Sequence, residues 1–169
     1  MFSANLTLNM SGNKTIIIGL GNELLSDDGI GPKLLKSLDK IIEDRNIITT
    51  VACCGGLELM EQLQGFSRAI LLDAIRTVDG KPGNVYYFTP SDFRETSNLS
   101  NLHNINFITA LHLGNFLELD IPADLHIIAV EISEDREFSE NLTEILEARY
   151  PQILEEVHAT IKQIIEGRK

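Results

Sequence analysis

The chain has 169 residues, with 14 Lys and Arg against 25 Asp and Glu, so its formal net charge at pH 7 is −11. This length suits one domain, and a composition of 43% hydrophobic and 23% charged residues is typical of a folded globular protein. The acidic balance argues against partners bound by phosphate neutralisation, such as DNA, tRNA or an anionic membrane. It is compatible with a metal cation or a basic protein surface.

Cysteine usage and hydropathy indicate a reducing, cytoplasmic compartment. The two cysteines, Cys53 and Cys54, are adjacent and close too short a loop to staple a fold. No apolar stretch reaches the roughly 18 residues of a transmembrane helix, and Met1–Asn13 lacks the basic start and apolar core of a secretory signal. We expect a polar tail over residues 1–13 and a single α/β domain over residues 14–169, with no membrane insertion.

Short apolar strands alternate with amphipathic helices along the chain. β-branched or apolar runs predict five strands, and apolar residues at helical spacing predict the helices. The turn at 80–83 is short, so we expect the strand after it to be an antiparallel neighbour of the one before, since a parallel return needs a crossover of about a dozen residues. The expected strands are Lys14–Gly19, Ile47–Ala52, Arg68–Ala74, Asn84–Phe88 and Leu125–Val130, and the expected helices are Gly29–Glu43, Leu57–Gln64, His103–Leu117, Ser139–Arg149 and Gln152–Ile165, with Pro151 suited to the first turn of the last.

This alternation predicts a three-layer α/β sandwich with a five-stranded, mostly parallel sheet and one antiparallel strand. In such sheets, ligands bind beyond the carboxyl ends of the strands. The loops that follow Gly19, Ala52 and Asp73 are therefore the expected location of a functional site.

The first of these loops begins like a dinucleotide-binding fingerprint but does not complete it. Gly19 and Gly21 have the right spacing, whereas Leu24 stands where the third glycine belongs. Asp27 and Asp28 follow at the start of the next helix, where their charges would repel a pyrophosphate. One aspartate can cap the helix while the other faces the crevice. We expect no tight binding of NAD.

Two further polar residues reach the same edge of the sheet. Asp73 interrupts an apolar strand at its carboxyl end, where it either starts the next loop or needs a partner, a metal or hydrogen bonds. His103 begins the helix that descends into the fifth strand, whereas His112 lies over two turns further down. Asp28, Asp73 and His103 thus converge into a site suited to a first-row divalent metal ion.

Other candidate side chains receive structural interpretations. Cys53 and Cys54 end the second strand at this edge, where a thiolate could bind a soft metal or act as a nucleophile; we expect small buried residues instead. His126, in the fifth strand, and His158, on the last helix, are expected to be packing or surface residues. No Gly-X-Ser-X-Gly elbow or His-Glu-X-X-His helix is present, which argues against serine hydrolases and ordinary zinc proteases.

Several of these segments together resemble the hydrogenase maturation endopeptidase family. Residues 19–31, GLGNELLSDDGIG, are similar to its N-terminal signature GxGNxLxxDDGxG. Cys54-Gly55-Gly56 resembles its Asp-Gly-Gly turn, residues 71–74 resemble its second acidic motif, and Leu102-His103-Asn104 resembles its Ser-Pro-His segment. The similarity runs from about residue 14 to residue 165.

The resemblance implies a phosphorylase/hydrolase-like fold and an aspartic or metallo-type endopeptidase that removes the C-terminal extension of a [NiFe] hydrogenase large subunit after nickel insertion. It implies that Asp28, Asp73 and His103 are the metal-binding and catalytic residues, which recognise the precursor's nickel or another divalent ion. Asp27 is the nearest spare carboxylate and is expected to act as a base or to support the site. The expected partner is the large-subunit precursor, and we expect the chain to act as a monomer.

Two departures from the family pattern leave alternatives open. Cys54 replaces the Asp before Gly-Gly, and Asn101-Leu102 replaces the Ser-Pro before the histidine. If that Asp takes part in hydrolysis, this chain needs another base, or it is a non-catalytic nickel-sensing binding protein or chaperone. A peptidyl-tRNA hydrolase also starts with a strand and Gly-Leu-Gly-Asn, but it would need a basic face for tRNA.

Overall fold

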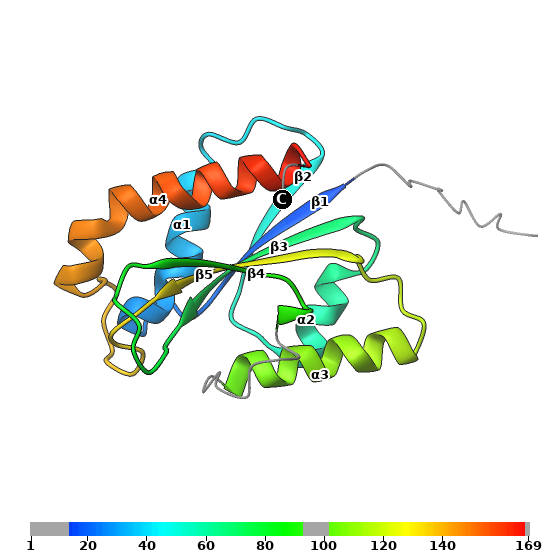
Figure 1. Cartoon of the computed structure of the whole chain (residues 1–169), viewed down its shortest axis with the longest axis horizontal. Helices are drawn as coiled ribbons and strands as arrows, with labels where there is room; N and C mark the ends of the chain where they lie inside the picture. Colours follow the sequence, from blue (N-terminus) through cyan, green and yellow to red (C-terminus); the bar gives the residue numbers. More distant parts are fainter. Residues whose placement is uncertain (1–13, 93–101, 168–169) are drawn as a thin grey trace, which may run out of the picture.

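The computed structural model describes the backbone of residues 14–92 and 102–167, and the side chains of these residues except 57 and 102–108. Five strands form one sheet in the order β2-β1-β3-β5-β4, and every pairing is parallel except β4 with β5. Helices α1 and α4 cover one face, and α2 and α3 cover the other (Figure 1). The elements are β1 (Thr15–Leu20), α1 (Ile30–Leu38), β2 (Ile47–Ala52), α2 (Gly56–Leu63), β3 (Arg68–Ile75), β4 (Val85–Phe88), α3 (Leu102–Phe116), β5 (Asp124–Glu131) and α4 (Glu144–Ile165).

This arrangement confirms the expected three-layer α/β sandwich with one antiparallel strand. The tail expected over residues 1–13 lies outside the described residues. Within the described ranges, no helix combines the length and the apolar character needed to cross a membrane.

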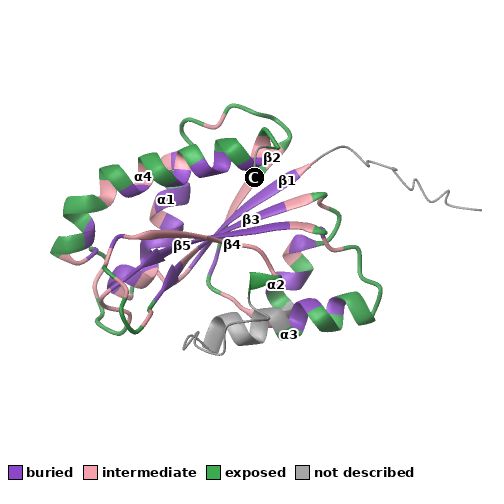
Figure 2. Cartoon of the chain, in the orientation of Figure 1, coloured by how far each residue is buried: buried purple, intermediate pink, exposed green. Residues whose placement is uncertain are grey.

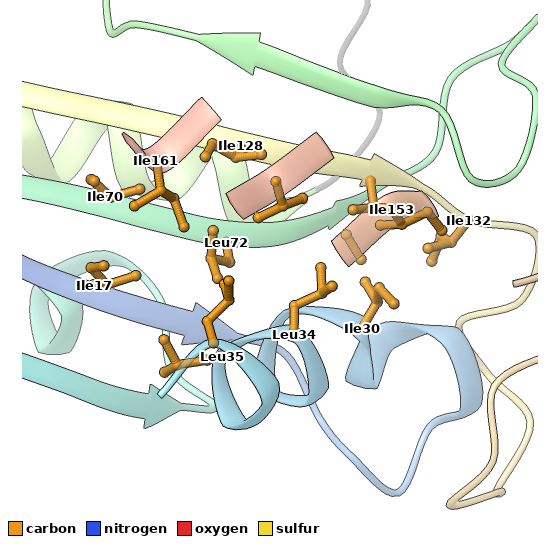
Figure 3. Close-up of a cluster of buried hydrophobic side chains, with 14 of the residues drawn as sticks. Ile17, Ile30, Leu34, Leu35, Ile70, Leu72, Ile128, Ile132, Ile153 and Ile161 are labelled. Carbon is orange, nitrogen blue, oxygen red and sulfur yellow. The ribbon is translucent and has the colours of Figure 1, made fainter. Parts of the chain in front are cut away.

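The central strands are buried on both faces, which explains their continuous apolar sequence. All six residues of β1 are buried (Figure 2). Ile17 packs on the side of α1 and α4, in the cluster drawn in Figure 3, whereas Ile16 and Ile18 pack on the side of α2 and α3. Because successive side chains of a strand point to opposite faces, one β-branched run supplies both halves of the core.

The fourth strand lies at an edge of the sheet and does not pair with the strand before it. β4 is antiparallel, as expected, but its partner is β5, which lies between β3 and β4. The connection from Ile75 to Val85 passes the end of β5, where Gly83 N donates to Glu131 O and Glu131 N donates to Asn84 O. The expected pairing with the preceding strand is therefore wrong, because this connection leaves room for a strand from later in the chain.

α4 is a single helix where two were expected. Pro151 lies inside it, and residues 139–143 are not helical. A proline inside a helix costs about 3 kcal/mol, because a backbone hydrogen bond is lost. Buried residues on both sides of Pro151, Leu146 and Ile153 among them, form one apolar face against the sheet. Each such side chain contributes about 1.5–3 kcal/mol when buried, so the continuous face outweighs the proline.

α1 packs against β1 and β3 through a backbone contact that only glycine allows. A Cβ atom on Gly31, in the first turn of α1, would lie 2.4 Å from the carbonyl oxygens of both Leu20 and Leu72. Gly21 has a φ of +135°, and a Cβ atom there would lie 1.9 Å from Asp28 O. These glycines therefore fix how closely the loop, and Asp28 with it, approaches the end of the sheet.

We predict that Gly31→Ala lowers the free energy of unfolding by about 3 kcal/mol, since the backbone oxygens that meet the new methyl group cannot move aside. Gly114→Ala is the matched control in a second helix, because its Cβ atom would first meet the end of the flexible Met60 side chain. Alanine also favours a helix by about 1 kcal/mol over glycine, so this variant should be nearly neutral. Urea unfolding measures both, and an equal loss in the two variants would contradict the close approach at Gly31.

Candidate active site

Asp28 and Asp73 lie together at the carboxyl edge of the sheet. Asp28 belongs to the 3-10 turn η1 (Ser26–Gly29) after β1, and Asp73 lies near the end of β3, the parallel neighbour of β1. Asp28 Oδ2 accepts a hydrogen bond from Asn22 N at 2.7 Å, and Asp73 Oδ1 accepts one from Ala74 N at 2.8 Å. The structure thus brings two of the predicted site residues together, with each carboxylate oriented by a backbone donor.

Burial raises the pKa of Asp73 to about 7. Loss of hydration is the largest cause, the hydrogen bond from Ala74 opposes it, and the nearby charge of Asp28 raises the pKa further. A carboxyl group with such a pKa changes protonation state near neutral pH, as groups in functional sites often do. A divalent cation would favour the charged form, so this pair of carboxylates fits one chemically.

The backbone of α3 brings His103 toward the same edge. Just after the far end of the helix, Asp120 O accepts a hydrogen bond from Gly65 N, which precedes the start of β3. The 15 residues of the helix rise about 22 Å, close to the length of a strand, so its first turn lies near the carboxyl ends of the strands (Figure 1).

The imidazole of His103 lies outside the described side chains, so its part in the site stays a prediction. Among the side chains that the structure describes, no three His, Cys, Asp or Glu residues form a group able to hold a metal ion. A metal site at this edge would therefore need His103 or ligands supplied by a partner.

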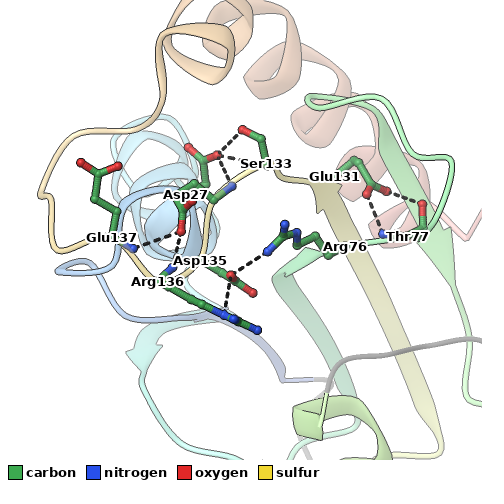
Figure 4. Close-up of polar contacts among 9 residues, drawn as sticks. Asp27, Arg76, Thr77, Glu131, Ser133, Asp135, Arg136 and Glu137 are labelled. Carbon is green, nitrogen blue, oxygen red and sulfur yellow. Dashed lines mark hydrogen bonds and ion pairs between the residues drawn. The ribbon is translucent and has the colours of Figure 1, made fainter.

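Asp27 is fully buried and faces the segment after β5. Its Oδ2 accepts hydrogen bonds from the backbone N–H groups of Ser133 and Glu134 and from the hydroxyls of Ser133 and Thr143, and its Oδ1 accepts one from Thr143 N at 2.7 Å. Figure 4 shows this carboxylate beneath the loop. Thr143 is the N-cap of α4, so Asp27 stabilises the start of a helix 116 residues away. These contacts support the site-supporting role, and the role as a base stays a prediction.

The loop after β5 also lies at the carboxyl edge of the sheet, and the sequence analysis did not predict this. Arg76, just after β3, pairs with Asp135 of this loop at 2.9 Å (Figure 4). Ser133 and Asp135 carry no motif that links them to β1 or β3. Threonine is a preferred N-cap residue, however, so Thr143 could have located the start of α4.

The expectation that both cysteines are buried is wrong. Cys53 is exposed and Cys54 is half-buried, because they follow β2, which is the strand at one edge of the sheet. Gln62 Nε2 donates a hydrogen bond to Cys54 Sγ at 3.4 Å. Burial raises the pKa of the Cys54 thiol, with a further contribution from the charge of Glu58. A reactive thiolate needs the opposite shift, so this site does not favour a cysteine nucleophile.

Two of the other histidines, His126 and His158, have the packing or surface roles expected of them. His126 is buried in β5, with Tyr87 Oη at 2.8 Å from one ring nitrogen and Asp124 at 2.7 Å from the other. His112 is exposed on α3, and His158 is half-buried on α4. The described backbone therefore leaves His103 as the histidine nearest the carboxyl edge.

Comparison with known proteins identifies the family. The family model described as hydrogenase maturation protease matches residues 32–160 of this chain. The chain belongs to the hydrogenase maturation protease family. It is 26% identical over 153 residues to the Hydrogenase 2 maturation protease of Escherichia coli strain K12, an alignment that covers 89% of this chain and 92% of the relative. It is also 26% identical over 125 residues to the coenzyme F420 hydrogenase subunit delta of Methanothermobacter thermautotrophicus, covering 70% and 75%.

Solved structures of hydrogenase maturation proteases share the fold. A hydrogenase maturating endopeptidase from Escherichia coli has a TM-score of 0.72 at 24% identity, covering 89% of this chain and 93% of that one. A [NiFe] hydrogenase maturation protease from Thermococcus kodakarensis has a TM-score of 0.66 at 25% identity, covering 87% and 98%. Family and fold confirm the resemblance found in the sequence, support a peptidase, and argue against the peptidyl-tRNA hydrolase alternative.

We predict that Asp27→Asn lowers the free energy of unfolding by about 3 kcal/mol. Both oxygens of Asp27 accept hydrogen bonds from N–H groups, and in asparagine an NH₂ group, which can only donate, would replace one of these oxygens. Asp79→Asn is the control on an exposed aspartate and should change stability by less than about 0.5 kcal/mol. Urea unfolding at neutral pH compares the two. A loss as small for Asp27 as for Asp79 would show that the buried contacts contribute little.

We predict that Asp73→Asn stabilises the protein at pH 8 and not at pH 4. The pKa of Asp73 in the folded state, about 7, exceeds the roughly 3.9 of an unfolded aspartate, so the folded state binds the extra proton and stability falls as pH rises through this window. Asparagine stays neutral, and its Oδ1 can still accept from Ala74 N. Since Asp73 is partly exposed, we expect a gain of about 1–2 kcal/mol at pH 8.

Unfolding by urea at pH 4, 6 and 8 measures this gain. Asp79→Asn is again the control, because Asp79 is exposed. A difference between Asp73→Asn and the wild type that is constant with pH would mean that Asp73 has an ordinary pKa.

Proposed function

We propose that this chain is an endopeptidase that removes the C-terminal extension from the large-subunit precursor of a [NiFe] hydrogenase, and that it recognises the nickel already inserted there. The proximity of Asp28 and Asp73 at the carboxyl edge of the sheet, in a chain of the maturation protease family, is the observation that carries this proposal. The family membership supports the peptidase activity and the class of substrate.

The proposed nickel site consists of Asp28, Asp73 and His103. Two carboxylates and an imidazole suit a first-row divalent ion and leave positions for ligands that the precursor retains. Nickel is then part of the substrate, and another divalent ion is the alternative occupant. The raised pKa of Asp73 supports this role, because a cation would replace the hydration that the carboxylate loses by burial.

Peptide hydrolysis at this site needs an activated water and a proton for the leaving amine. A bound divalent ion polarises the scissile carbonyl or lowers the pKa of a bound water. Asp73, with a pKa of about 7, has the proton affinity of a general acid–base group. Asp27 joins the loop that carries Asp28 to the loop after β5, so it supports the site, and its role as a base stays a prediction. Both a metallo-type and an aspartic-type mechanism use these groups.

Removal of nickel from the precursor tests whether the metal is recognised. Cleavage of the nickel-loaded precursor and not of the nickel-free precursor supports recognition of nickel, whereas equal cleavage of both supports an aspartic mechanism that needs no metal. We also propose that the chain acts as a monomer in the cytoplasm, where its free cysteines would stay reduced.

One observation favours a second function, that of a non-catalytic nickel-sensing binding protein or chaperone. Cys54 stands where the family pattern has an Asp, and its raised pKa keeps it from replacing a carboxylate as a base. A stable complex with the nickel-loaded precursor and no shortened large subunit would support this function.

We predict that His103→Ala abolishes shortening of the large subunit, because the proposed nickel site loses its imidazole. His112→Ala is the matched control on the same helix and should leave cleavage within about twofold of the wild type, since His112 is exposed and lies nine positions further along α3. Incubation with nickel-loaded precursor followed by mass spectrometry of the large subunit measures both. Loss of cleavage with His112→Ala and not with His103→Ala would contradict the proposed placement of α3.

A further inference from the structure

An exposed aromatic residue lies beside the candidate active site. Phe138, in the loop after β5, is 84% exposed, and Leu24, in the loop after β1, is 52% exposed. Ser139 N donates to Leu24 O at 3.0 Å, and Ser26 N donates to Ser139 O at 2.8 Å. The parallel bridge between Leu25 and Ser139 therefore brings Leu24 and Phe138 to neighbouring positions in two adjacent segments.

The backbone on either side of Phe138 is held by hydrogen bonds. Asp27 accepts hydrogen bonds from two backbone N–H groups near the start of the loop, those of Ser133 and Glu134, and from the N–H of Thr143 at its end. Within the loop, Glu134 Oε1 accepts hydrogen bonds from Arg136 N at 2.7 Å and Glu137 N at 3.1 Å (Figure 4). An apolar side chain on a backbone that is already ordered loses little conformational entropy on binding, which favours it as an anchor in an interface.

Charged residues of both signs lie in the segments next to this apolar pair. Arg76 pairs with Asp135 at 2.9 Å, Lys33 Nζ donates to Glu140 O at 2.6 Å, and Lys36 pairs with Glu23, the neighbour of Leu24. Basic side chains therefore compensate the acidic residues of the loop. The exposed apolar pair on an ordered backbone, rather than a net charge, is what a partner with an apolar pocket would recognise.

We propose that Leu24 and Phe138 form the apolar centre of a docking surface for the hydrogenase large-subunit precursor, whose matching surface is an apolar pocket. The identity of this partner rests on the proposed function. The surface is continuous with the candidate active site, because Leu24 and Asp28 belong to the same short loop and Asp27 joins that loop to the loop of Phe138. A precursor docked there has its C-terminal extension within reach of Asp28 and Asp73.

Titration calorimetry of the nickel-loaded precursor, with its extension intact, tests this surface on the wild type, Phe138→Ala and Phe116→Ala. Phe116 is the matched control, because it is 82% exposed but ends α3 at the opposite edge of the sheet. We expect Phe138→Ala to raise Kd at least about tenfold and Phe116→Ala to change it less than about twofold.

Cleavage measured on the same samples separates this proposal from the proposed function. Equal affinity of Phe138→Ala and the wild type would overturn the docking surface, and cleavage by the wild type would leave the peptidase function intact. A wild type that binds through Phe138 without shortening the large subunit would support the docking surface and overturn the peptidase function. No binding of the precursor by the wild type would overturn both.

Discussion

A buried carboxylate joins parts of this protein that are far apart in the chain. Asp27 accepts five hydrogen bonds from Ser133, Glu134 and Thr143. Burial of a charge is costly unless hydrogen bonds replace its hydration, so this carboxylate and its donors stabilise one another only when all are in place. Ser26, next to it, has a φ of +49°, a backbone conformation that persists where surrounding contacts enforce it. The position of Asp28 follows from this arrangement.

Two adjacent aspartates thus have different environments, and the sequence indicated this only in outline. The pattern at residues 19–31 predicted that one aspartate caps a helix while the other faces the crevice. Asp27 instead binds the backbone N–H of Thr143, the residue that precedes α4, and neither α4 nor α1 begins with a side-chain cap. Nothing within residues 19–31 encodes a partner more than a hundred residues away, because that contact exists only once the sheet has formed.

The parts of the fold that could be predicted are those that depend on local periodicity. Short β-branched or apolar runs identified every strand, and a polar residue near the end of such a run, Asp73, marked the carboxyl edge. The partner of β4 and the continuity of α4 past Pro151 were not predictable in this way. Both depend on surface supplied by other segments: β5 for the first, and the apolar face of the sheet for the second. The same holds for the proximity of Asp28 and Asp73, which depends on the order of the strands.

The buried Asp27 differs from Asp28 and Asp73 of the candidate site in how far the protein's own hydrogen bonds replace the hydration of its carboxylate. The donors around Asp27 replace its lost hydration from within the chain. At Asp73, burial raises the pKa and the charge of Asp28 raises it further, whereas a single backbone N–H group lowers it. The pKa of Asp73 is therefore about 7. Ionisation of a carboxyl group with a raised pKa costs the folded protein free energy. A cation brought by a partner would recover this energy on binding. The proposed recognition of a metal-bearing substrate would therefore take place at the incompletely compensated pair rather than at the fully bonded Asp27.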